Sequence, residues 1–198
     1  GTCALGARLR AQGRRADGTR RAAPRPGVVD GAAAVVLTNK SGKGLAKPVR
    51  VLASVVQSGV FETGPVDMTE AEITARAARL AYEQAGVGPE DLSLIELHDA
   101  FTISELLYYE ALGLCKRGEA QHLLTSGATS LGGRIPVNPS GGLLAKGHPP
   151  GATGVAQIVE ICEQLQQRAG KRQVQGARLG LSQVTGGGIW GVDHAACS

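Results

Sequence analysis

A lone histidine, His148, stands in a loop whose backbone is unusually permissive. The stretch from Asn138 to Gly154 reads NPSGGLLAKGHPPGATG, holds five glycines and three prolines, and precedes a helical pattern. Glycine lets the backbone approach a ligand closely, and free N–H groups at the start of a helix attract anions. A histidine can take or give a proton at neutral pH. The stretch therefore predicts a loop that holds a ligand beside an acid–base group.

Two other segments carry residues of the same kind. ELHDAF (96–101) ends an apolar run at His98, and VTGGGIWG (184–191) follows a strand-like run with a triple-glycine turn. Such a turn can present bare backbone N–H groups to a developing oxyanion. Each segment falls at the end of a predicted strand or the start of a helix, where α/β folds usually bind ligands. Two histidines beside a glycine turn suit acyl or enolate chemistry.

Strand-like and helix-like segments alternate around these residues. Apolar runs predict strands over 30–39, 48–59, 91–98 and 177–184, the first of them buried and the last the final strand. Helical periodicity predicts a helix capped by Thr69 and Glu72 and stopped by Gly86, and further helices over 104–114 and 155–165, with 132–149 as loop. The alternation predicts an α/β layered domain.

The composition indicates one domain built on small aliphatic side chains. The chain has 198 residues, of which 42% are hydrophobic and only 3% aromatic. No apolar run approaches the roughly 20 residues of a membrane span, so no membrane-spanning helix is expected. The four cysteines show no metal-ligand spacing. We therefore expect no metal, and reduced thiols in a cytoplasmic setting.

The basic charge of the chain is concentrated at its start. The net charge is +4, but residues 1–29 hold seven Arg and one Asp, which leaves −2 for residues 30–198. A nucleic-acid partner for the domain is therefore not expected. Residues 1–29 show no helical or strand period and predict a disordered or non-native Arg-rich segment, with a transit peptide as the alternative. Residues 30–198 form the predicted domain.

The three segments together resemble the thiolases. The stretch from Asn138 to Gly154 resembles their NxxGG…GHPxGxTG signature, and VTGGG resembles their CxGGG loop. ELHDAF resembles the HDCF or HDAF segment of the lipid-transfer (sterol-carrier) and archaeal-type thiolases. The resemblance covers residues 30–198, about the C-terminal half of a thiolase subunit. It implies a thiolase-like layered fold, of which this would be the C-terminal repeat, a mixed sheet covered by helices.

The resemblance implies a reaction at a carbon–carbon bond beside an acyl-CoA thioester. His148 would activate a nucleophilic Cys and help hold a thioester oxygen. His98 would help form one oxyanion hole, and Gly186 would offer its backbone N–H to the other. Contacts to the acyl-CoA would come from Asn138, Ser140, Gly141, Gly147 and Gly187. A coenzyme A thioester would be the substrate, with no covalently bound cofactor.

The sequence departs from the thiolase pattern at the cysteines. No segment resembles the motif around the nucleophilic Cys, Val184 stands where CxGGG has its acid–base Cys, and Ala100 stands where HDCF has Cys. Three functions stay open. The first is a thiolase-family acyltransferase of lipid or sterol side-chain metabolism that lacks the nucleophile half here. The second is a thiolase-like retro-aldolase of steroid degradation that cuts a β-hydroxyacyl-CoA or steroid-CoA with a partner of oligonucleotide-binding-type fold. The third is a non-catalytic acyl-CoA or lipid-binding module, or a truncated inactive product. A homodimer is expected.

Plainer interpretations exist for several of these residues. Asp99 could cap the following helix with His98 merely packed, and the glycines after Thr185 could be only a turn. Lys146 could meet a CoA phosphate, although a solvated loop lysine is commoner. Cys162 falls in a helical apolar stripe and is expected in the core, together with at least one of Tyr108 and Tyr109.

Overall fold

The computed structural model describes residues 27–39, 47–59, 67, 69–187 and 193–198, and the backbone alone of 2–3 and 10–11. For residues 193–194 it likewise describes only the backbone. The prediction for residues 1–29 lies almost entirely outside this range, as does the end of the TGGGIWG segment.

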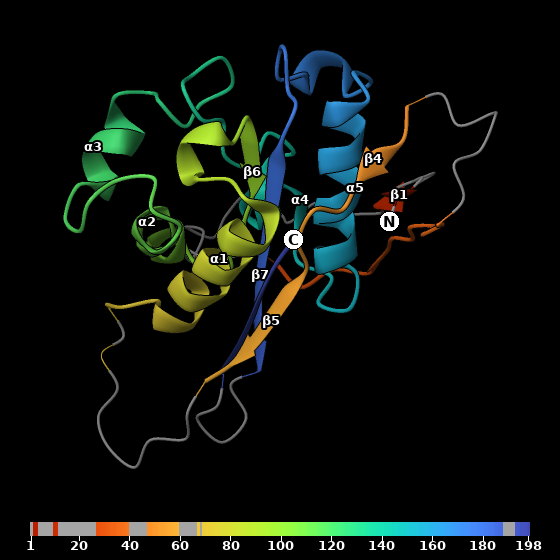
Figure 1. The fold of residues 1–198 in the computed structure, drawn as a ribbon. Coiled ribbons are helices and arrows are strands. Elements are labelled where there is room, and N and C mark those ends of the chain that lie inside the picture. Colours follow the sequence, from red (N-terminus) through yellow and green to blue (C-terminus); the bar gives the residue numbers. More distant parts are fainter. Residues whose placement is uncertain are drawn as a thin grey trace, which may run out of the picture.

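A four-stranded mixed sheet forms the centre of the molecule (Figure 1). Its order is β5 (Val55–Ser58), β8 (Asp193–Cys197), β7 (Gly180–Gly187) and β6 (Leu94–Glu96). β6 and β7 are parallel, with Ile95 opposite Leu181, and the other two pairs are antiparallel. Both strands therefore run toward the same edge of the sheet, and β7 continues from Ser182, opposite Glu96, to Gly187.

Helices cover both faces of this sheet. α1 (Glu72–Ala85) lies against β5 and β8 on one face, and α5 (Thr153–Leu165) lies against β6 and β7 on the other (Figure 1). α2 (Thr102–Ala111) packs on α1, and α3 (Ala120–Thr125) packs on α2. The predicted α/β fold with helices on a mixed sheet is confirmed.

Several short elements complete the described fold. β1 (Thr2–Cys3) pairs with β4 (Val49–Arg50), and β2 (Arg10–Ala11) pairs with β3 (Gly31–Ala32), both antiparallel. The remaining helical turns are η1 (Pro89–Asp91), α4 (Gly142–Lys146) and η2 (Gly170–Arg172). Among the described residues, no helix is both long and apolar enough to span a bilayer.

Small and aliphatic side chains build the core, as the composition predicted. α1 buries Ala77, Ala78 and Ala81, whose small size lets the helix lie close to the sheet. The other side of the sheet buries Val159 and Cys162 of α5. α1 ends at Gly86, which takes a left-handed φ of 70° and donates its amide to Tyr82 O at 2.8 Å, the predicted stop. Tyr109 is fully buried, so the expectation for one core tyrosine is confirmed.

The predicted buried strand over residues 30–39 is wrong. Only Gly31–Ala32 is strand, residues 33–38 lie outside the four-stranded sheet, and Val36 and Leu37 are 62% and 69% exposed. An apolar run becomes strand only where a neighbouring strand supplies its hydrogen bonds. The run over 48–59 is likewise divided, into β4 and β5.

Three smaller predictions also need correction. Thr69 does not cap α1, because its hydroxyl donates to Asp67 Oδ1 at 2.6 Å and the N-cap residue is Ala71. The predicted loop over 132–149 contains α4. β7 is not the last strand, because β8 follows it.

We expect the stability of the fold to depend on β6. Ile95 is fully buried, so Ile95→Ala should lower the free energy of unfolding by about 2–5 kcal/mol through lost burial and a cavity. Ile103 is 58% exposed, and Ile103→Ala should change the free energy of unfolding by less than about 0.5 kcal/mol. Urea unfolding followed by circular dichroism compares the two. Equal losses would contradict this account of the core.

Candidate functional site at the carboxyl ends of β6 and β7

The structure brings the two predicted histidines together. The rings of His98 and His148 lie with centroids 4.9 Å apart and planes at 89°, so one ring meets the other edge-on. His98 follows β6 by two residues, whereas His148 lies between α4 and α5. Segments 50 residues apart in the sequence therefore form one pair.

His148 is oriented by the first turn of α5. Its Nδ1 lies 2.8 Å from Thr153 Oγ1, and that hydroxyl donates to Pro149 O at 3.0 Å. With its only proton given to Pro149, the Thr153 hydroxyl accepts from Nδ1–H. This assignment leaves Nε2 of His148 as the nitrogen that can take a proton. Thr153, which orients His148, is not among the site residues predicted from the sequence.

His98 is held from behind by a buried glutamine. The His98 amide donates to Gln183 Oε1 at 3.0 Å, and Gln183 Nε2 donates to Thr74 Oγ1 of α1 at 3.2 Å. Gln183 is fully buried on β7, one residue before Val184. The sequence analysis also missed this residue, although a glutamine inside an apolar strand run is an available signal.

Both imidazoles are neutral at pH 7. Burial, and then the neighbouring His148, lower the pKa of His98 to about 4. Burial also lowers the pKa of His148, against an opposing effect of Asp99. The pair can therefore accept a proton at neutral pH without first losing one.

Asp99 caps a helix, but not the one that the sequence suggested. Its carboxylate accepts the backbone N–H groups of Leu143 at 2.7 Å and Leu144 at 3.3 Å, both in α4. The N-cap of α2 is Phe101, which makes no side-chain cap. Asp99 thus ties the residue beside His98 to the loop that carries His148.

Asn138 joins the same two segments from the other side. Its side-chain Oδ1 accepts a hydrogen bond from the backbone N–H of Leu97 at 2.8 Å, and its backbone N–H donates to Ile95 O at 2.7 Å. Asn138 Nδ2 and His98 Nδ1 are buried and make no hydrogen bond to any described residue. Buried polar atoms of this kind normally have a partner, and the described residues supply none for these two.

The glycines of the loop serve close packing within the chain. A Cβ on Gly142 would lie 2.2 Å from Asp99 Oδ2, and one on Gly147 would lie 2.7 Å from Val29 Cγ2. Gly147, predicted to contact acyl-CoA, thus has its α-carbon against Val29. Gly141, with a φ of 94°, precedes α4 and donates its amide to Asn138 O at 2.8 Å.

Gly186 and Gly187 lie at the exposed end of β7. A Cβ on Gly186 would meet nothing within 4 Å, so there is open space beside its α-carbon, whereas its backbone pairs with that of His194 in β8. The strand end is positioned by Thr185 Oγ1, which hydrogen-bonds Tyr108 Oη at 2.7 Å. Val184 packs toward Gly154 of α5, since a Cβ added to Gly154 would lie 3.6 Å from Val184 Cγ1.

The described cysteines offer no reactive thiolate at this site. Burial raises the pKa of Cys197 to about 12 and also raises the pKa of Cys115. Cys162 is 2% exposed in α5, the core position predicted for it. Within the described residues, no group of three or more His, Cys, Asp or Glu could hold a metal ion.

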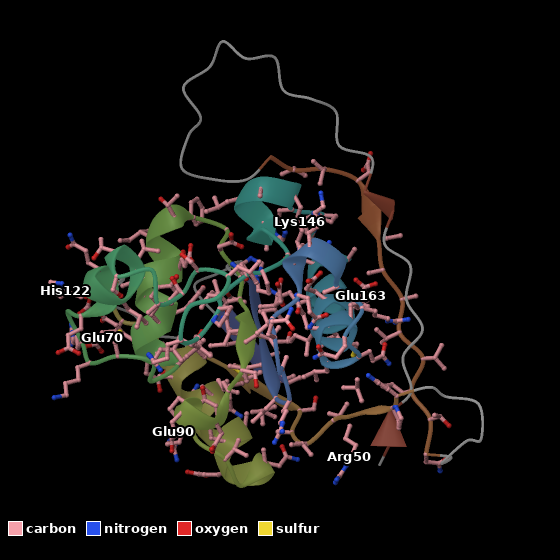
Figure 2. The ribbon with its side chains drawn as sticks, turned by 90° about the horizontal axis from the view of Figure 1, so that it is seen from above. Arg50, Glu70, Glu90, His122, Lys146 and Glu163 are labelled. Carbon is pink, nitrogen blue, oxygen red and sulfur yellow. The ribbon has the colours of Figure 1, made fainter. Side chains whose placement is uncertain are left out.

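An apolar cavity of the described structure lies away from the two histidines. It has a volume of about 510 Å³, lies at the starts of β6 and β7, and is lined largely by apolar residues with Arg50 at its wall. Figure 2 places Arg50 and Lys146, two residues before His148, on opposite sides of the molecule. Neither histidine lines this cavity.

We expect the buried histidine to make stability depend on pH. The pKa of His98 falls from 6.5 to about 4 on folding, so the unfolded chain binds more protons between those values. Stability should therefore fall as pH drops from 6.5 to 4, by about 3 kcal/mol from His98 at pH 4. His98→Gln should flatten this dependence, whereas exposed His122, in His122→Gln, should leave it unchanged. Urea unfolding at pH 7, 5.5 and 4.5 measures the slopes. If the stability of His98→Gln falls with pH as steeply as that of the unaltered chain, His98 is not the source of the pH dependence.

Comparison with known proteins shows which family the chain resembles. Residues 62–195 match the family described as "Thiolase C-terminal domain-like". The chain is 45% identical over 178 residues to benzoylsuccinyl-CoA thiolase subunit BbsB of Thauera aromatica, covering 87% of this chain and 46% of that protein. It is 45% identical over 165 residues to human sterol carrier protein 2, covering 79% of this chain and 30% of that protein.

A solved structure shares the fold. The Ltp2-ChsH2(DUF35) aldolase superposes with a TM-score of 0.72 at 23% identity, covering 86% of this chain and 46% of the other. The chain thus spans half or less of the length of the relatives it matches. From its family match and its identity to these relatives, the chain belongs to the thiolase family, whose C-terminal domain-like region it contains.

Proposed function

We propose that this chain supplies the histidine and backbone-amide elements of an acyl-CoA site at which a carbon–carbon bond beside the thioester is broken or formed. The observation that carries the proposal is the edge-on pair of neutral His98 and His148 rings. Gly186 is exposed near the end of β7, the strand that runs parallel to β6. A thioester enolate needs a base at the α-carbon and N–H donors at its oxygen.

Each residue has a role in this proposal. His148 Nε2 takes or returns the proton, because Thr153 occupies Nδ1. His98 and Asn138 Nδ2 face the thioester oxygen, which would give the two buried atoms their partner. Gly187 offers its backbone N–H to the second oxyanion, and Gly186, whose backbone pairs with His194, holds that strand end in place. Ser140, Gly141 and Gly147 hold the loop around the CoA moiety.

The leading form of the reaction is thiolysis or acyl transfer. This form requires a thiolate that carries the acyl group. Cys115 and Cys197 are protonated at neutral pH, and Cys162 is buried in α5. The thiolate would therefore come from outside the described residues. A partner polypeptide or a segment outside the described residues would supply it. We also propose that the chain forms a homodimer, although a second copy brings no cysteine that the chain itself lacks.

The second form is retro-aldol cleavage of a β-hydroxyacyl-CoA. The presence of Val184 and Ala100 where thiolases of these types carry cysteine favours it. A histidine removes the hydroxyl proton, the Cα–Cβ bond breaks, and its electrons enter the thioester enolate. The enolate then takes the proton at Cα, and the products are a ketone or aldehyde and a shortened acyl-CoA. No nucleophilic cysteine is needed, and we propose a steroid-CoA substrate and a partner of oligonucleotide-binding-type fold for this form. A binding module without turnover is the third candidate.

Three assays on one preparation separate these functions. CoA-dependent loss of a 3-oxoacyl-CoA indicates thiolysis, and release of a ketone or aldehyde from a β-hydroxyacyl-CoA indicates the aldolase. Saturable acyl-CoA binding by calorimetry with neither reaction indicates the binding module. Absence of binding and of both reactions would overturn the proposal.

We expect both histidines to matter for turnover, and for different reasons. His148→Ala should lower kcat by about 10²–10⁴-fold because the proton acceptor is lost. His98→Ala should lower kcat by about 10²–10³-fold because an oxyanion donor is lost. Exposed His122, replaced in His122→Ala, provides the control and should keep full activity. Steady-state kinetics measures the effects, and full activity in His148→Ala would exclude its role as base.

A further inference from the structure

Glu96 is a buried charge at the last position of an apolar strand. It is 1% exposed, at the end of β6. Its Oε1 accepts the Ser140 amide at 3.0 Å, its Oε2 accepts the Ser140 hydroxyl at 2.6 Å, and Lys146 Nζ lies 3.6 Å from Oε2. Burying a carboxylate is costly unless it is paired and hydrogen-bonded, and this one is both.

Ser140 connects the two charges. Its hydroxyl donates to Glu96 and accepts from Lys146 Nζ at 2.6 Å and from the Gly142 amide at 3.2 Å. A serine hydroxyl has one proton and two lone pairs, and all three are used here. The arrangement of serine and lysine is therefore that of a structural junction and not of a nucleophile with its base.

The Glu96 contacts join the two histidine-bearing segments. Glu96 lies two residues before His98, and Lys146 lies two residues before His148. Asn138 and Asp99 make parallel attachments between the same segments. Glu96 adds an ion pair between the two segments, with Lys146 at the end of α4 (Figure 2).

The charge of Glu96 depends on its neighbours. Burial raises the pKa of Glu96 above its ordinary value, against the opposing effects of Lys146 and the Ser140 hydrogen bonds, and Glu160 acts in the same direction as burial. Glu160 is itself paired with Arg172 at 2.9 Å. Loss of Lys146 would leave a buried carboxylate without its counter-ion.

We propose that Glu96, Ser140 and Lys146 form a positioning unit that fixes the separation of the His98 and His148 rings by holding the loop against the end of β6. The three residues do not touch the reacting atoms. The unit's effect on catalysis rests on the proposed function, whereas its effect on the ring pair is independent of turnover.

The test uses the full chain and the NMR titration of its histidine rings. In Lys146→Met, the loop should move from β6, and the His148 ring should gain solvent. Its pKa should rise toward the ordinary value by at least about half a unit. The facing groups of His148 are His98, Asp99 and Thr153, and none of them is changed. The His122 signal is the internal control, and His148→Gln assigns the resonance.

A matched variant separates positioning from general destabilisation. Arg172→Met removes the partner of Glu160, another buried carboxylate, which belongs to α5. It should lower stability as much as Lys146→Met and leave the His148 titration unchanged. An equal shift of His148 in both variants would mean that any loss of a buried ion pair moves the rings, and would overturn the proposal.

The double variant Glu96→Gln/Lys146→Met tests the ion pair itself. It removes both charges, so it should unfold at a higher urea concentration than Lys146→Met alone. Ser140→Ala keeps the charges but breaks the junction and should shift His148 less than Lys146→Met. If Lys146→Met does not fold, Ser140→Ala and Lys146→Arg still report the titration. An unshifted His148 in every folded variant would overturn the proposal.

Turnover gives a separate readout where the acyl-CoA reaction is observed. Misplacing the ring pair should lower kcat by about tenfold or more with little change in KM, and Lys146→Arg should restore part of it. Absence of turnover in the unaltered chain would count against the proposed function. The NMR result would still decide the positioning proposal.

Discussion

The parallel pairing of β6 with β7 is the constraint on which the site depends. The two strands run in the same direction with Glu96 opposite Ser182, so their carboxyl ends point toward the same edge of the sheet, β7 extending further, to Gly187. His98 follows one strand, and Gly186 lies at the end of the other. The free side of β6 is taken by residues 136–138, through a parallel bridge between Ile95 and Val137. β6 thus has β7 on one side and the start of the histidine loop on the other.

Two buried carboxylates then hold the loop in place. Glu96 and Asp99 are 1% and 2% exposed, and each would be destabilising if it were unpaired. Each instead accepts backbone N–H groups of the loop, at Ser140 and at Leu143. The cost of burying the charges makes the docked loop strongly preferred over a loosened one. It also explains the glycine at 142, since a side chain there would collide with Asp99.

Sequence reasoning succeeded where the signal is local. The helix predicted over 155–165 is found as α5, and the strand predicted over 91–98 is found in part as β6, because side-chain period and apolar runs within a dozen residues indicate both. It failed where the deciding partner is distant. α4 lies in a glycine-rich stretch and is capped by Asp99, 44 positions before Leu143. The residues next to α4 in the sequence therefore give no signal for a helix. The run over 33–38 has strand composition but lies outside the sheet. β8 is short and rich in alanine, and its pairing with β5 and β7 cannot be seen from its own residues.

The candidate site was partly predictable for the same reason. The two histidines stand in recognisable motifs, but their edge-on contact depends on attachments that motifs do not show. Gln183, Thr153 and Glu96 each carry a polar group into an apolar or glycine-rich segment. A polar residue where the pattern calls for an apolar one was the signal for these attachments. Such residues are retained only where a buried partner offsets their desolvation.

The ring pair behaves as a unit that holds one proton at most near neutral pH. Both rings are neutral at pH 7, and protonation of either ring opposes protonation of the other at a separation of 4.9 Å. Burial weakens both as bases, but His148 has Asp99 nearby to favour its charged form, whereas His98 has no such neighbour. The single proton therefore belongs on His148. An asymmetry of this kind suits the proposed chemistry, in which one imidazole carries the proton between substrate atoms while the other stays a neutral donor to an oxyanion.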